Sequence, residues 1–247
     1  IATNLLVAEA AQAHVRRQWL SGLHAMYAVS SLLAPFWVTL LYRAGLGWRS
    51  ALVWLALGSL GVCGLTLAAG RSRGQARFRP PVVRRKGATP ARPIRAGVYY
   101  GLLCTCYVVA ELAISTRLPL YARRESGYSV EAANLLLSAF FLGLLVGRFV
   151  FAIRSTPWGS RSVLAWSAAS GFACFVLGLT HHPAWLAAAG LCFSVFYPAT
   201  MALVGDEHSA QGTTAFVTSW CITLQSVGVI AMHLGVSELS DRFDLGR

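Results

Sequence analysis

The sequence predicts an all-α polytopic membrane protein, and three observations lead to that fold class. Of the 247 residues, 56% are hydrophobic and 12% are charged, whereas soluble domains carry about 25% charged residues. Seven stretches have the roughly 20 largely apolar residues that a transmembrane helix needs. A single basic, proline-rich segment interrupts these stretches and supplies most of the net charge of +12.

Each predicted helix is an apolar run that ends where polar, glycine or proline residues gather. Residues 1–13 are typical of the end of a helix. Because the chain opens at Ile1 inside this pattern, we expect a further N-terminal segment upstream. The seven complete spans follow in order at residues 18–42, 49–70, 96–122, 130–153, 161–180, 183–205 and 212–236.

The basic segment, Arg71 to Arg95, determines the expected orientation of these helices. It contains nine Lys or Arg residues, four Pro and no Asp or Glu, so a regular helix cannot continue through it. Basic, proline-rich runs are also found in disordered linkers and nucleic-acid-binding tails, but the apolar flanks argue against nucleic acid here. A basic loop between membrane spans is retained in the cytoplasm. We therefore expect this loop on the cytoplasmic side.

Several classes of chemistry lack their usual residues. The six cysteines lie in apolar runs without a C-x-x-C pair, which predicts small buried side chains rather than disulfides or metal ligands. Motifs for zinc proteases, serine hydrolases and phosphate-binding loops are missing from the sequence. The only lysine, Lys86, lies in the basic loop and cannot carry retinal within the membrane. We therefore expect neither an enzyme nor a cofactor or metal.

Charged residues within the spans are the first candidates for function, because a charge at membrane depth is costly. Glu111 lies near the middle of its span and shares a helix face with Tyr107 and Ser115. It is a candidate for substrate or proton handling. The alternative is a protonated carboxylic acid buried between helices. Arg117 and Arg148 lie nearer the span ends and are expected to snorkel to the lipid headgroups.

Other polar and small residues complete the predicted sites. His24 and Tyr27 share one face of the first complete span, and their alternative role is ordinary hydrogen bonding within the bundle. Pro198 leaves the carbonyl of Ser194 without a helical donor, which predicts a kink. The remaining candidates are Asn134 and Gln225 for the solute or proton pathway, and Gly143, Gly147 and Arg148 for gating or packing.

The segment from Tyr107 to Val150 resembles helices seven and eight of a major facilitator superfamily (MFS) transporter, most closely in the sugar-transporter branch related to fucose permeases. It contains a Glu in mid-helix, then Leu-Pro-Leu-Tyr, a short loop with Gly-Tyr-Ser, and a helix that ends near Gly147 and Arg148. Two further segments resemble this family: TNLLVAEAAQAHVRRQWLSGLHAMYAVSSLLAP matches the end of helix four to helix five, and FYPATMAL matches the middle of helix ten.

This resemblance implies a partial MFS helix bundle that covers the end of helix four to helix eleven. Residues 1–70 would end the N-terminal six-helix half, residues 71–95 would form the cytoplasmic loop, and residues 96–247 would belong to the C-terminal half. Since most of one half would be missing, we expect these residues alone not to transport.

The resemblance also implies secondary transport of a small solute by alternating access around a mid-membrane site. A sugar is the candidate solute and the proton is the candidate coupling ion. The expected setting is the bacterial cytoplasmic (inner) membrane, with the lipid bilayer as partner and no nucleic acid. The rival hypothesis is a truncated or degenerate relative with a non-transporting, structural role. Substrate, coupling ion, direction and oligomeric state are open at this point.

Overall fold

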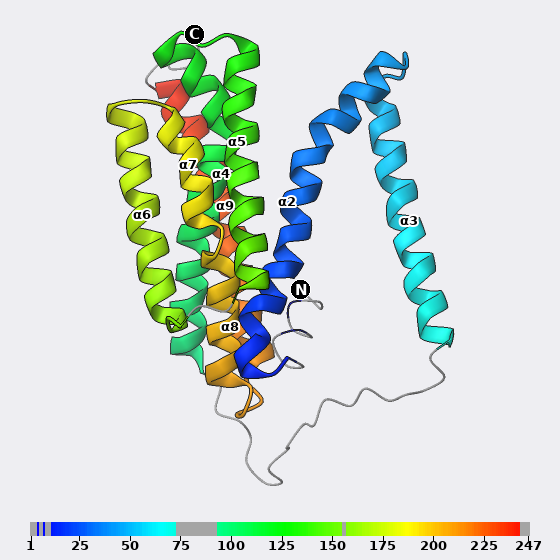
Figure 1. The fold of residues 1–247 in the computed structure, drawn as a ribbon, viewed down its shortest axis with the longest axis vertical. Coiled ribbons are helices and arrows are strands. Elements are labelled where there is room, and N and C mark those ends of the chain that lie inside the picture. The colour runs from blue at the N-terminus through cyan, green and yellow to red at the C-terminus, as the bar shows by residue number, and fades with distance from the viewer. Residues whose placement is uncertain (1–3, 5–6, 8–10, 73–92, 155–156, 243–247) are drawn as a thin grey trace. The chain divides into compact units, whose positions relative to one another are not determined.

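The computed structural model describes residues 4, 7, 11–72, 93–154 and 157–242. Every secondary-structure element in this part of the chain is an α helix (Figure 1), which confirms the predicted fold class. The helices are α2 (Ala13–Arg43), α3 (Trp48–Ser72), α4 (Ile94–Ser126), α5 (Val130–Ile153), α6 (Ser160–Thr180), α7 (Ala184–Phe193), α8 (Phe196–His208) and α9 (Thr214–Arg242).

Six helical stretches among the described residues are long and apolar enough to cross a membrane. Large apolar side chains point outward from them, for example Leu65 and Phe172, as expected where lipid rather than water surrounds the helices. The expected span 18–42 lies within α2, which is not among the six. The stretches are Arg49–Ala68, Ile94–Ser126, Val130–Ile153, Ser160–Thr180, Ala184–His208 and Thr214–Glu238.

The expected span 183–205 is divided into two helices by a short break. Helix α7 ends at Phe193 and α8 begins at Phe196. Pro198 has no backbone N–H, so it cannot donate a helical hydrogen bond to the carbonyl of Ser194. The predicted kink thus becomes an interruption of the helix at residues 194 and 195.

Some sequence predictions concern residues outside the described part of the chain. The helix end expected at residues 1–13 falls largely among them, and so does most of the basic loop. The described chain divides into two compact units, one made of Ile1–Ala28 and Val83–Arg247 and the other of Val29–Val82. The division at residues 70 and 95 and the orientation in the membrane stay predictions.

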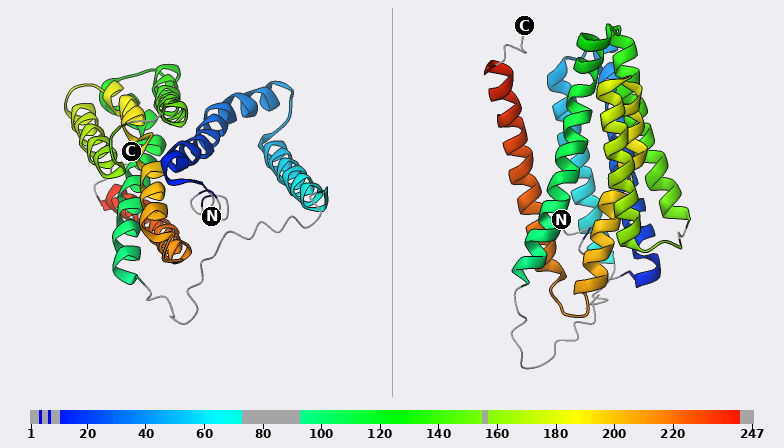
Figure 2. Two further views of the ribbon diagram at one scale, coloured as in Figure 1. Left: turned by 60° about the horizontal axis from the view of Figure 1, so that its bottom comes forward. Right: turned by 90° about the vertical axis from the view of Figure 1, so that its left-hand side faces the viewer.

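The larger unit is a helical bundle in which α9 runs alongside α4 and α7 lies between α5 and α6 (Figures 1 and 2). The break between α7 and α8 lies within this bundle, and α8 packs against α4, α6 and α9. The smaller unit contains the whole of α3 and the part of α2 that begins at Val29. Within it the rings of Trp37 and Trp54 meet edge to face, with centroids 6.0 Å apart.

Glycines allow α5 and α7 to approach closely. A Cβ atom at Gly143 would lie 2.9 Å from the backbone nitrogen of Leu191, and one at Gly190 would lie 2.1 Å from the carbonyl oxygen of Phe140. The close contact therefore uses a glycine from each of the two helices.

We expect Gly190→Ala to destabilise the protein by about 1–3 kcal/mol, because the new methyl group has no space and displaces the backbone of Phe140. Gly235→Ala is the matched control. A Cβ there meets nothing within 4 Å, and alanine favours the helix by up to about 1 kcal/mol. Thermal unfolding in detergent, followed by tryptophan fluorescence, measures both. Equal midpoints for the two variants would contradict the close approach.

The cysteines are free, as far as the structure describes them, but two are exposed. Cys104, Cys174 and Cys221 are buried and Cys192 is half-buried, whereas Cys63 and Cys106 are exposed. The expectation that all six would be buried was wrong for these two. An apolar run does not determine which helix face meets another helix and which faces outward.

Candidate functional site

Arg148, on α5, is the centre of the most extensive buried polar network that the structure describes. Its side chain is only 3% exposed. The Nε group donates to the carbonyl of Ser194 at 3.2 Å, Nη1 donates to the carbonyl of His24 at 3.1 Å, and Nη2 donates to the hydroxyl of Tyr107 at 2.9 Å. The guanidinium also forms an ion pair with Glu111, with 3.5 Å between Nη2 and Oε2.

This environment corrects the expectation that Arg148 snorkels to the headgroups. The side chain points into the bundle and bonds groups from α2, from α4 and from the α7–α8 break. Its own carbonyl accepts a hydrogen bond from the hydroxyl of Ser21 on α2, at 2.7 Å. Five N–H donors on a rigid plane suit guanidinium to such a position. Arg117, by contrast, is exposed.

The α7–α8 break explains why Ser194 can accept from Arg148. Pro198 cannot donate to the Ser194 carbonyl, and a buried carbonyl without a partner would cost about 1–3 kcal/mol. Arg148 supplies the missing donor. Pro198 thus leaves a free carbonyl acceptor in the bundle interior, and the Arg148 guanidinium donates a hydrogen bond to it.

Glu111 is buried on α4, with 7% of the residue exposed. Its carboxylate accepts a hydrogen bond from the hydroxyl of Tyr107, one helical turn earlier, and pairs with Arg148. The expected alternatives were a pathway residue or a neutral acid between helices, and neither included an arginine partner. Because a buried charge is costly without a counter-charge, the position of Arg148 provides what an ionised Glu111 needs.

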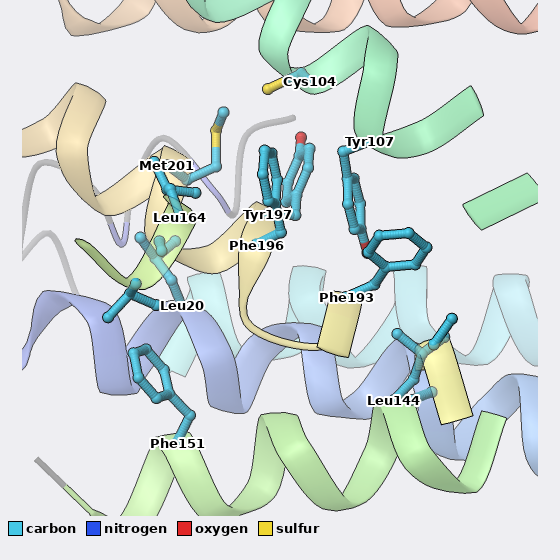
Figure 3. Close-up of a cluster of buried hydrophobic side chains, with 14 of the residues drawn as sticks. Leu20, Cys104, Tyr107, Leu144, Phe151, Leu164, Phe193, Phe196, Tyr197 and Met201 are labelled. Carbon is cyan, nitrogen blue, oxygen red and sulfur yellow. The ribbon is translucent and has the colours of Figure 1, made fainter. Parts of the chain in front are cut away.

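Aromatic rings enclose the polar network on one side. The ring of Tyr107 stacks on Phe196 with centroids 5.3 Å apart and an interplanar angle of 3°, and it meets Phe193 edge to face at 6.1 Å. Tyr197 lies 6.0 Å away, tilted by 39°. Figure 3 shows these four rings gathered around the break between α7 and α8. Low polarity around a charge pair strengthens the attraction within it.

Two predicted residues of α2 reach the same network. The His24 ring meets Tyr197 edge to face, with centroids 4.8 Å apart, and its Nε2 atom is buried without a hydrogen-bond partner. Tyr27 is half-exposed, and its ring centroid lies 5.7 Å from the Cζ atom of Arg148, a distance at which a cation attracts an aromatic face. Helix α2 therefore contributes both a backbone acceptor and two side chains.

Gln225 approaches from α9. Its side chain lies close to Tyr197, and its Oε1 atom is buried without a hydrogen-bond partner. The structure thus brings Glu111, Tyr107, His24, Tyr27 and Gln225 together around Arg148 and Tyr197.

The other predicted residues have different places. Ser115 is half-buried further along α4, and its hydroxyl lies 3.4 Å from the carbonyl of Leu112 in its own helix. Asn134 is exposed near the start of α5. Gly147 lies against α7, where a Cβ would come within 2.0 Å of the Ser194 hydroxyl oxygen, and Pro198 is buried at the break.

Sequence reasoning missed Tyr197 and Ser21 as neighbours of this network. Tyr197 directly precedes Pro198, so its position beside an interrupted helix in the interior of the bundle was a usable signal. Ser21 lies one turn before His24 on the same helix face. Which residue it would contact had no signal in the sequence.

A second polar cluster lies where α8 ends. Arg16, buried at the start of α2, pairs with Asp206. The neighbouring Glu207 accepts hydrogen bonds from Arg161 at 2.8 Å and from the hydroxyl of Tyr100 at 2.6 Å. Helix α2 is therefore joined to α8 by charge at one end and to α5 by Arg148. In the described part of the chain, no three His, Cys, Asp or Glu residues form a metal-binding group.

The family model of the Major Facilitator Superfamily matches residues 1–232. The chain belongs to this superfamily. Neither a curated protein nor a solved structure matches it. Members of the superfamily are transporters rather than enzymes, so this MFS protein is an integral membrane protein of a family that moves small solutes across membranes.

Proposed function

We propose that this MFS protein is a secondary active transporter that carries a sugar by alternating access and couples it to protons. The observation that carries the proposal is the buried Glu111–Arg148 pair between α4 and α5, whose arginine also donates a hydrogen bond to the His24 carbonyl of α2. Ionisable pairs inside transporters are costly to bury and are typical of substrate or proton pathways.

The contacts of Arg148 indicate how a proton would change the protein. While Glu111 is ionised, its charge and the Tyr107 hydroxyl hold the guanidinium in place, and the guanidinium holds the carbonyl of His24 on α2. Protonation of Glu111 removes the charge that balances Arg148. The hydrogen bond from Arg148 to the His24 carbonyl then weakens. Helix α2 can then move relative to the other helices, as alternating access of the binding site from the two sides of the membrane requires.

The segment from Tyr107 to Val150 resembles the fucose-permease-like branch, and this resemblance supports the choice of a sugar. Tyr107, Glu111 and Gln225 provide the hydroxyl, carboxylate and amide groups that suit solute hydroxyls. In this proposal Ser115 and Asn134 belong to the wider solute pathway. Gly143 and Gly147 allow the close helix packing around which the helices move. The setting we propose is the bacterial cytoplasmic membrane.

Uptake into proteoliposomes tests the proposal. We expect the full-length protein to accumulate at least one labelled neutral hexose, with saturable kinetics, when the outside is acidic relative to the lumen. A proton ionophore should abolish accumulation while leaving slow equilibration. Absence of uptake across a panel of sugars, amino acids and organic acids, by protein that is monodisperse and folded, would favour the non-transporting alternative instead.

A further inference from the structure

Tyr197 is a neighbour of two side chains that each carry a buried polar atom without a hydrogen-bond partner. The residue is on α8 and is 7% exposed. The His24 ring, from α2, meets it edge to face, and the Gln225 side chain, from α9, lies close to it. The Nε2 atom of His24 and the Oε1 atom of Gln225 are both left without a hydrogen bond.

Two such atoms beside one side chain need an explanation. Most buried polar atoms in folded proteins have a partner, and each one without costs about 1–3 kcal/mol. The neighbouring network does not supply a donor or acceptor, because Arg148 and Glu111 use their groups on each other, Tyr107 and the two carbonyls. The unused atoms therefore point to a bound group that is supplied from outside the chain.

The chemistry of the two atoms defines that group. The Gln225 Oε1 atom only accepts, so its partner must carry an O–H or N–H, while the imidazole Nε2 donates or accepts according to its tautomer. A hydroxyl both donates and accepts, so a solute with hydroxyls on neighbouring carbons satisfies both atoms. The surrounding rings of Tyr107, Phe196 and Tyr197 provide the apolar surface that binding sites place next to a few polar groups.

Charge narrows the class of solute further. The carboxylate and the guanidinium nearest to Tyr107 pair with each other at 3.5 Å, so neither is left to balance an ion. An anionic solute would compete with Glu111 for Arg148, and a cationic one would compete with Arg148 for Glu111. Breaking a buried pair in this way is strongly unfavourable.

We propose that His24, Tyr197 and Gln225 form a hydroxyl-binding subsite that selects uncharged polyhydroxylated solutes such as hexoses. The inference rests on the proposed transport function, because the atoms are buried here and a solute reaches them only when the site opens during alternating access. It adds to that function a position for the solute and a reason for its neutrality.

Equilibrium dialysis with the full-length protein in lipid nanodiscs tests the subsite independently of transport. The probes are labelled D-glucose, D-galactose and L-fucose, with D-glucuronate as an anion and L-lysine as a cation. We expect at least one neutral hexose to bind and both ions to fail. Gln225→Met and His24→Leu should each weaken its binding about three- to tenfold, the loss expected for one neutral hydrogen bond. The matched controls Gln211→Met and His233→Leu change exposed residues and should bind as wild type.

Different results separate this inference from the transport proposal. Hexose binding unchanged in both variants would overturn the subsite and leave transport standing, as would binding of glucuronate or lysine without any hexose. If no probe binds, the neutral-hexose class is refuted, and the uptake assay decides separately whether transport fails too. If either variant unfolds, the test is instead the binding of deoxyhexoses to wild-type protein. One missing hydroxyl should then weaken binding at least threefold, and equal affinity across the deoxyhexoses would contradict the subsite.

Discussion

Arg148→Met is expected to destabilise the protein by about 3–5 kcal/mol, the cost of removing one partner from a buried ion pair. The substitution keeps a long side chain in the bundle but leaves Glu111 without its counter-charge and the carbonyl of Ser194 without its donor. The free energy of unfolding of a protein is only about 5–15 kcal/mol. Most of the variant should therefore fail to accumulate as monodisperse protein. Gel filtration and thermal unfolding in detergent measure the loss.

A double variant separates the charge from the packing. In Arg148→Met/Glu111→Gln the uncompensated charge is gone, so we expect much of the lost stability to return, with the remainder due to the unpaired carbonyls of Ser194 and His24. Arg117→Met is the matched control, since Arg117 is exposed on α4, and it should stay within about 0.5 kcal/mol of wild type. Additive losses for the two substitutions at positions 111 and 148 would show that the pair contributes nothing.

Glu111→Gln is expected to lower proton-driven uptake about ten- to hundredfold while the protein stays folded. The amide can still accept from Tyr107 and contact Arg148, but it cannot take up a proton or provide a charge. A hydrogen bond to a charged group is worth about 1.5–3 kcal/mol, and each 1.4 kcal/mol corresponds to a factor of about ten. Uptake at several external pH values measures the change, and the variant should lose the stimulation by acid.

Two comparisons make this prediction specific. Glu131→Gln removes an exposed carboxylate in the first turn of α5 and should leave uptake and its pH dependence intact. Glu111→Ala also removes the groups that contact Tyr107 and Arg148, so it should lower the melting temperature further than Glu111→Gln does. A folded Glu111→Gln protein with the wild-type rate and pH profile would restrict Glu111 to a structural role between helices.

Helix positions could be predicted closely because they depend on local properties of the sequence. The expected span 130–153 coincides with α5, and the expected span 161–180 differs from α6 by one residue at its start. An apolar run that is long enough to cross a bilayer and is bounded by charges, glycine or proline shows where a helix begins and ends. The division of residues 183–205 into α7 and α8 was foreseen only as a kink, since whether a proline bends or interrupts a helix depends on which donors surround it.

The candidate site was predictable only where its residues share one helix. The four-residue spacing of Tyr107 and Glu111 placed them on one face of α4, and their hydrogen bond follows from that spacing. Arg148 was expected at the headgroups because hydropathy gives its depth along the helix but not the direction of its side chain. Its partners are 41, 46 and 124 residues distant in sequence.

The sequence by itself determined that this protein is a bundle of membrane-spanning helices, that a carboxylate lies in the middle of α4, and that Pro198 frees a carbonyl in the interior. Only the tertiary structure decided that Arg148 binds that carbonyl and pairs with that carboxylate, and that His24 and Gln225 meet at Tyr197. The physical reason is range. Hydropathy and helical periodicity act over a few turns, whereas the cost of a buried charge or an unpaired polar atom is relieved by whichever helix packs opposite.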